Sequence, residues 1–160
     1  IGMRGLSLPQ LPAKRLGQLL KASGIRKQIV VVSACYSGGF IAPLAGPTTW
    51  VTTAARADRT SFGCADENDF TYFGRALFKE SLPRAAGLGS AFDHARQLVA
   101  QWEKTGTDQT GEAGTLAAQP KDDKNQPGDD AQHSEPQMSV TAAFQREVDA
   151  WIAAHPAVGP

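Results

Sequence analysis

The stretch Gln28-Ile-Val-Val-Val-Ser-Ala-Cys35-Tyr-Ser-Gly-Gly39 joins a β-branched run to a cysteine and two glycines. Residues 28–34 show no alternation of polar and apolar side chains, which favours a strand buried on both faces of a parallel sheet. The glycines then end the run. Because ligands of open parallel sheets bind at the carboxyl ends of the strands, the sequence predicts that Cys35 lies on the binding face.

Patterns on both sides of this stretch indicate an α/β domain. Leucines at helical spacing predict a helix over 11–23, and a second β-rich segment follows at 48–54. Further helices are expected over 70–82, 90–104 and 144–152, with a short edge or final strand at 137–140. Their expected buried faces are Phe70, Phe73, Leu77 and Phe78, then Phe92, Ala95, Val99 and Trp102, and finally Phe144, Val148, Trp151 and Ile152.

Composition excludes several classes of function. The 160 residues contain 16 Lys+Arg and 16 Asp+Glu, so the chain has the size of about one domain and no charge excess that would favour nucleic acid or an anionic membrane. The longest strongly apolar run, residues 29–32, is far shorter than the ~18 residues of a membrane span. Cys35 and Cys64 lack the paired spacing of a zinc site, so no metal is predicted, and the compartment stays open.

One segment cannot contribute to a core. Residues 105–135 contain no aromatic side chain, one large aliphatic residue (Leu116), and seven acids against two lysines. The sequence therefore predicts a disordered polar and acidic insertion over 105–133, which divides a single domain into residues 1–104 and 134–155.

Residue chemistry alone leaves the role of Cys35 open between a nucleophile and an inert buried thiol. Reactivity requires the thiolate, and a free cysteine titrates near ~8.5 unless a cation, an imidazole or a helix N-terminus lowers its pKa. A Cys-x5-Arg phosphatase loop would need arginine where Ile41 stands. A nucleophile elbow around Ser37 fits only in part, since Cys35 occupies the position of its first glycine. No phosphate-binding Gly-Lys-Ser/Thr sequence follows Gly39.

Four motifs that follow one another along the chain indicate the function more specifically than Cys35 does. They are residues 29–39, Thr52-Thr-Ala-Ala55, Asp66-Glu67 and Thr71-Tyr-Phe-Gly74. Together they resemble the legumain family of cysteine peptidases, within the caspase-like clan, and in particular a bacterial branch of it. The resemblance covers residues 1–104 and 134–152. It implies a three-layer α/β sandwich with a mainly parallel sheet flanked by helices, of which this chain is a C-terminal part. It also implies hydrolysis of peptide or protein substrates by a Cys/His dyad through an acyl-enzyme, without a cofactor.

The resemblance assigns roles to individual residues. Cys35 matches the nucleophile, and its backbone N–H matches one oxyanion donor, in a turn that contains Gly38 and Gly39. Two departures leave a preference for asparagine open: the acidic residues that flank the nucleophile in legumains are absent, and an arginine replaces an asparagine. The corresponding specificity-pocket positions in this chain are Ser33, Tyr36, Arg56 and Asp66; solvated ion pairs are the alternative for the charged ones.

The catalytic histidine of that family stands before the nucleophile, but this chain has no histidine before Cys35. The chain also opens at Ile1. We therefore expect a fragment whose histidine lies on absent sequence, inactive as a peptidase and less stable by itself. His94 is expected to face solvent, His133 to belong to the insertion, and His155 to sit at a fraying terminus.

Three further expectations accompany this assignment. Cys64 is expected to be a half-buried free thiol, and a Cys35–Cys64 disulfide would abolish the nucleophile. A catalytically inactive interaction module is the alternative function, with contacts made by the acidic insertion or by residues 1–57, which hold seven Lys/Arg and no acid. A transamidase that uses the same thiolate is the other alternative.

Overall fold

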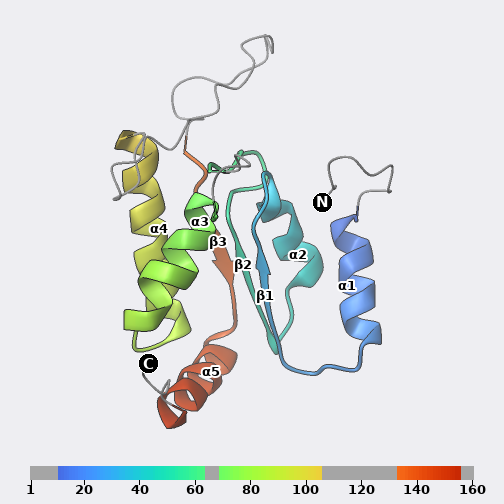
Figure 1. The fold of residues 1–160 in the computed structure, drawn as a ribbon. Helices are drawn as coiled ribbons and strands as arrows, with labels where there is room; N and C mark the ends of the chain where they lie inside the picture. The colour runs from blue at the N-terminus through green and yellow to red at the C-terminus, as the bar shows by residue number, and fades with distance from the viewer. Residues whose placement is uncertain (1–10, 64–68, 106–132, 156–160) are drawn as a thin grey trace.

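The computed structural model describes residues 11–63, 69–105 and 133–155. Within these ranges a three-stranded sheet lies between two groups of helices (Figure 1). The elements in chain order are α1 (Ala13–Ala22), β1 (Gln28–Val32), the 3-10 helix η1 (Ser37–Phe40), α2 (Ile41–Leu44), β2 (Thr49–Thr53), α3 (Tyr72–Gly74), the π-helix η2 (Arg75–Ser81), the 3-10 helix η3 (Leu82–Arg84), α4 (Leu88–Thr105), β3 (Gln137–Ser139) and α5 (Ala142–Ala154).

The sheet confirms the predicted α/β class. Its order is β1-β2-β3. Strands β1 and β2 are parallel, with Val30 opposite Val51, whereas β3 runs antiparallel to β2, with Met138 opposite Thr52. Since β3 forms one edge of this described sheet, the expectation of a short edge strand over 137–140 is confirmed.

Helices cover both faces of the sheet, as the three-layer expectation requires. In Figure 1, α3 and α4 lie on one side of the strands and α1 and α2 on the other, while α5 packs near one end. Trp50 of β2 is fully buried and packs in a cluster with residues of α4 and α5. The face predicted for α4 is also confirmed, because its four predicted residues are at most 3% exposed: Phe92, Ala95, Val99 and Trp102.

The prediction that residues 28–34 are buried on both faces is wrong. Strand β1 ends at Val32, and Ile29, its second residue, is 52% exposed. Among the described strands β1 pairs only with β2, so its other edge has no described neighbour that would cover Ile29.

The face predicted for residues 70–82 is wrong in part. Phe73 and Leu77 are buried, but Phe70 and Phe78 are 46% and 49% exposed. Phe70 lies outside the helix, because Thr71 is the N-cap and accepts a hydrogen bond from the Gly74 N–H at 3.0 Å. The following π-helix has wider turns than an α-helix, so a spacing read at 3.6 residues per turn points Phe78 to the wrong side.

Differences at the other helix ends are small. Helix α5 buries Phe144 and Val148 as predicted, but Trp151 is 63% exposed and stacks on His155 at 4.7 Å between ring centroids. Helix α4 extends through Thr105, the first residue of the predicted insertion. The insertion itself lies outside the described residues over 106–132.

None of the described helices is both long and apolar enough to span a bilayer.

Candidate active site

Cys35 follows the carboxyl end of β1, where the chain turns sharply. The next residue, Tyr36, has φ 58° and ψ 18°, a left-handed conformation that is uncommon for a residue with a side chain. This turn leads directly into η1 and leaves Cys35 exposed. The thiol therefore lies beyond the end of a parallel strand, where the sequence predicted it.

The loop after β2 contacts both Cys35 and the turn. The Ser61 N–H donates a hydrogen bond to the Cys35 sulfur at 3.3 Å, and the Ser61 hydroxyl lies 3.6 Å from the same atom. The Tyr36 N–H donates to the carbonyl of Arg59 at 2.7 Å. An N–H directed at the sulfur stabilises negative charge on it, since hydrogen bonds to charged groups are stronger than neutral ones.

A buried serine ties the turn to the end of β2. The Ser37 hydroxyl is fully buried, accepts a hydrogen bond from the Ala55 N–H at 3.0 Å and lies 3.4 Å from the Ala55 carbonyl oxygen. Sequence reasoning tested Ser37 only as a nucleophile and missed this role. A lone serine among small residues carries no local signal for it, because its partner is 18 residues away.

The two glycines of the turn have different surroundings. A Cβ on Gly38 would lie 2.4 Å from the Ala57 nitrogen, so only glycine allows the backbones to approach this closely. A Cβ on Gly39 would meet nothing within 4 Å. The Gly39 N–H donates to the Tyr36 carbonyl at 3.1 Å, so this N–H closes the turn.

Two predicted pocket residues lie beside Cys35. Ser33 is exposed, and its hydroxyl is 3.0 Å from the Thr71 hydroxyl, which joins the end of β1 to the start of α3. Tyr36 is 55% exposed. Asp66 and Cys64, and with them a Cys35–Cys64 disulfide, lie outside the described residues.

The fourth predicted pocket residue, Arg56, is held by two carboxylates. Its guanidinium makes two hydrogen bonds to Asp58, at 2.6 and 2.9 Å, and one to Glu135 at 2.8 Å. The hydrogen bond to Asp58 is the main cause that raises the pKa of Arg56, and the same bond lowers the pKa of Asp58. Glu135 was not predicted to take part in this region.

Each of the three imidazoles has a partner away from Cys35. His94 is exposed as predicted, and its Nδ1 lies 3.0 Å from the Ser81 hydroxyl. His133, placed in the insertion by the sequence, instead has its Nδ1 3.4 Å from a carboxylate oxygen of Glu103. The Nδ1 of His155 is 2.9 Å from the Trp151 carbonyl oxygen.

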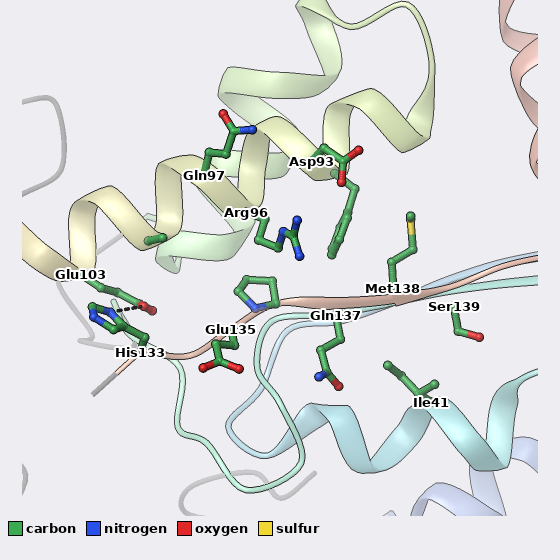
Figure 2. A pocket seen from close by; sticks show the side chains of 13 residues that line it. Ile41, Asp93, Arg96, Gln97, Glu103, His133, Glu135, Gln137, Met138 and Ser139 are labelled. Atoms are coloured by element: carbon green, nitrogen blue, oxygen red, sulfur yellow. Dashed lines mark ion pairs between the residues drawn. The ribbon is translucent and has the colours of Figure 1, made fainter. Parts of the chain in front are cut away.

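A groove of about 870 Å³ runs along β3, at the other edge of the described sheet from β1. Figure 2 shows the Glu103–His133 pair at one end of it, Arg96 in the middle and Ser139 near the other end. The Glu103 side chain is 1% exposed. Burial raises the pKa of Glu103, against the opposing effects of the Ser134 N–H and His133.

Sequence reasoning missed this groove, because α4 and β3 are separated by 31 residues and meet only in the fold. None of the predicted site residues that the structure describes lines it. Among the described residues no group of three or more His, Cys, Asp or Glu side chains is placed to hold a metal ion.

Comparison with known proteins identifies the family. A family model described as the peptidase C13 family matches residues 1–117, which is more than half of the chain and includes Cys35 and the turn after it. Neither the curated proteins nor the solved structures gave a significant match. On the strength of that family match, the chain belongs to the peptidase C13 family, the legumain family of cysteine peptidases.

Proposed function

We propose that this chain provides the nucleophile of a cysteine endopeptidase and that the nucleophile is Cys35. The observation that carries the proposal is the exposed Cys35 thiol at the end of a parallel strand, with the Ser61 N–H directed at its sulfur. Membership of a cysteine peptidase family supports the same reaction class.

The proposed reaction has two steps. The Cys35 thiolate attacks the carbonyl carbon of the scissile peptide bond, and the carbonyl oxygen becomes an oxyanion. Collapse of this intermediate breaks the C–N bond, so the amine leaves with a proton and the acyl group stays on sulfur as a thioester. Water then attacks the thioester, which releases the carboxylic acid and regenerates the thiol.

Two backbone features serve this chemistry. The left-handed conformation of Tyr36 turns the chain away immediately after Cys35, so that a substrate carbonyl can approach the sulfur. The Cys35 N–H is the proposed oxyanion donor from this chain, as the resemblance to legumains implies, and the Gly39 N–H donates within the turn. Gly38 lets the turn pack against residues 55–57.

The proton is moved by a histidine in this proposal. The resemblance to legumains places that residue before the nucleophile, where these 160 residues contain no histidine. His94, His133 and His155 each have a partner of their own and are not assigned the role.

We also propose that residues around Cys35 contact the substrate side chain next to the scissile bond. Ser33 and Tyr36 are exposed on either side of the nucleophile. Arg56 is the charged candidate there, and its two ion pairs with carboxylates balance its charge. Asp66 is also proposed to line this pocket, and for Asp66 the proposal rests on the sequence alone.

The test uses the full-length protein with Cys35→Ala. Cleavage of a mixed peptide library and labelling by a thiol-directed peptide probe should fall below detection, because Cys35 is the proposed group that forms the thioester. Cys64→Ala is the matched control, since it removes the other cysteine of the chain, and it should keep both signals within about threefold. Unchanged cleavage and labelling in Cys35→Ala would refute the proposal, whereas absence of cleavage by the unmodified protein would favour an interaction module.

Hydrolysis and transamidation differ only in the acceptor that resolves the thioester. Adding a primary amine to the peptide reaction and analysing the products separates them. Free carboxylic acids as the main products support the endopeptidase, whereas amide products at low amine concentration would point to a transamidase.

A further inference from the structure

A cluster of opposite charges connects the segment before β3 to the loop that contacts Cys35. Arg59 in this loop is buried, with a side chain 9% exposed. One of its terminal nitrogens lies 3.3 Å from a carboxylate oxygen of Glu135, and the other donates to the His133 carbonyl at 3.2 Å. The second carboxylate oxygen of Glu135 accepts from Arg56 at 2.8 Å.

Arg59 contacts the nucleophile turn with its own backbone. Its carbonyl accepts the hydrogen bond from the Tyr36 N–H, next to Cys35 in the chain. Two residues further along the loop, the Ser61 N–H donates to the Cys35 sulfur. A displacement of Arg59 therefore disturbs both the turn and the hydrogen bond to the thiol.

Glu135 occupies a conformation that the surrounding contacts must maintain. Its φ is 52°, in the left-handed region that residues with side chains seldom adopt. In Figure 2 its carboxylate points away from α4, whereas Glu103 extends from that helix. Such outliers persist where the neighbouring structure holds them, and they are concentrated at functional sites.

We infer that Glu135 is a positioning residue for the Cys35 site, acting through Arg59. The inference rests on the proposed function of Cys35. Glu135 neutralises the buried Arg59 guanidinium and so holds residues 56–61 against Cys35. Removal of the carboxylate that lies 3.3 Å from this buried guanidinium leaves its charge less compensated, which is costly, so the loop should shift toward water.

Asp58 provides a matched control. It is the other carboxylate bound to Arg56, but its side chain is 66% exposed, so water screens its attraction to Arg59. Asp58→Asn and Glu135→Gln each remove one negative charge from a carboxylate that binds Arg56. Glu135→Gln removes a carboxylate 3.3 Å from the Arg59 guanidinium, whereas Asp58→Asn removes an exposed one.

The experiment measures the alkylation rate of Cys35 by iodoacetamide in the full-length protein, quantified on the peptide that contains Cys35. Glu135→Gln should slow alkylation about tenfold, because the Ser61 N–H no longer holds the thiolate. Asp58→Asn should stay within about twofold. Glu135→Asp keeps the charge and suits a left-handed backbone, but its side chain is shorter, so it should slow alkylation about threefold, more than Asp58→Asn and less than Glu135→Gln.

Peptide cleavage gives the second readout. Displacement of the nucleophile should lower kcat in Glu135→Gln more than in Asp58→Asn, whereas KM should change alike in both, because each variant removes one carboxylate from Arg56. Equal alkylation rates in Glu135→Gln and Asp58→Asn would overturn the inference. If Glu135→Gln does not unfold cooperatively, Glu135→Asp carries the test: its shorter side chain must still slow alkylation measurably relative to Asp58→Asn.

These readouts separate the two proposals. If Cys35→Ala retains peptide cleavage, the proposed function fails, while the alkylation rates still report whether Glu135 positions the loop. If Cys35→Ala is inactive and Glu135→Gln alkylates normally, only the positioning role is wrong.

Discussion

The hydroxyl of Ser37 is the only hydrogen-bond acceptor found for the Ala55 N–H among the described residues, at 3.0 Å, and both residues are fully buried. This contact joins the turn that carries Cys35 to the end of β2. Ser37→Ala would leave the Ala55 N–H buried and unpaired, so it should lower the free energy of unfolding by about 1–3 kcal/mol.

Denaturant unfolding checks the effect of Ser37→Ala. Ser33→Ala is the control, because the Ser33 hydroxyl is exposed and water can replace its contact with Thr71. That change should alter the free energy of unfolding by less than about 0.5 kcal/mol. Equal effects of the two substitutions would contradict a structural role for Ser37.

Gly38 and Gly39 offer a second matched pair. Gly38→Ala places a methyl group 2.4 Å from the Ala57 nitrogen, so the loop must shift and the free energy of unfolding should fall by about 1–3 kcal/mol. Gly39→Ala meets nothing within 4 Å and should change it by less than about 0.5 kcal/mol. Thermal unfolding of both variants tests this order, and a more harmful Gly39→Ala would show that the turn is packed differently.

The π-helix η2 predicts unequal effects for two adjacent residues. Leu77 is fully buried, so Leu77→Ala should lower the free energy of unfolding by about 2–5 kcal/mol. Phe78 is 49% exposed, and Phe78→Ala should cost less than about 1 kcal/mol. An ordinary α-helix with Phe78 in the core would give a large loss for both, and urea unfolding distinguishes the two cases.

The buried carboxylate of Glu103 predicts an unusual pH dependence. Its pKa in the folded chain is raised above the ordinary value of 4.5, mainly by burial. The folded state therefore binds the proton more tightly than the unfolded state does. The stability that Glu103 contributes is fully present below about pH 4.5 and is lost as the pH rises through the raised pKa.

Unfolding of the unmodified chain and of Glu103→Gln, measured at a series of pH values, checks this sign. The unmodified chain should lose stability relative to Glu103→Gln as the pH rises above about 4.5. Glu80→Gln is a control of opposite sign, because the hydrogen bond from Arg84 lowers the pKa of Glu80. There the unmodified chain should lose relative stability as the pH falls below about 4.5. A difference with Glu103→Gln that does not vary with pH would show that Glu103 is well solvated.

Local patterns in the sequence were sufficient for the main elements of the fold. The β-branched run before Cys35 predicted a parallel strand, and the spacing of Phe92, Val99 and Trp102 predicted the buried face of α4. Such patterns succeed because a strand or an α-helix imposes a fixed period on the side chains that it buries. The same rule failed at Phe78, where a π-helix changes the period.

The surroundings of Cys35 were decided by the tertiary structure. The sequence alone indicated that Cys35 is a nucleophile and that it follows the end of a strand. This indication came from the cysteine, the glycines of the turn and the family resemblance. Nothing local indicated that Glu135 would meet Arg56, 79 residues earlier, or that Ser61 would face the sulfur. Ion pairs and single hydrogen bonds between distant segments have no period and leave no trace in neighbouring residues. They exist only once β2 and β3 have paired and brought the two segments together.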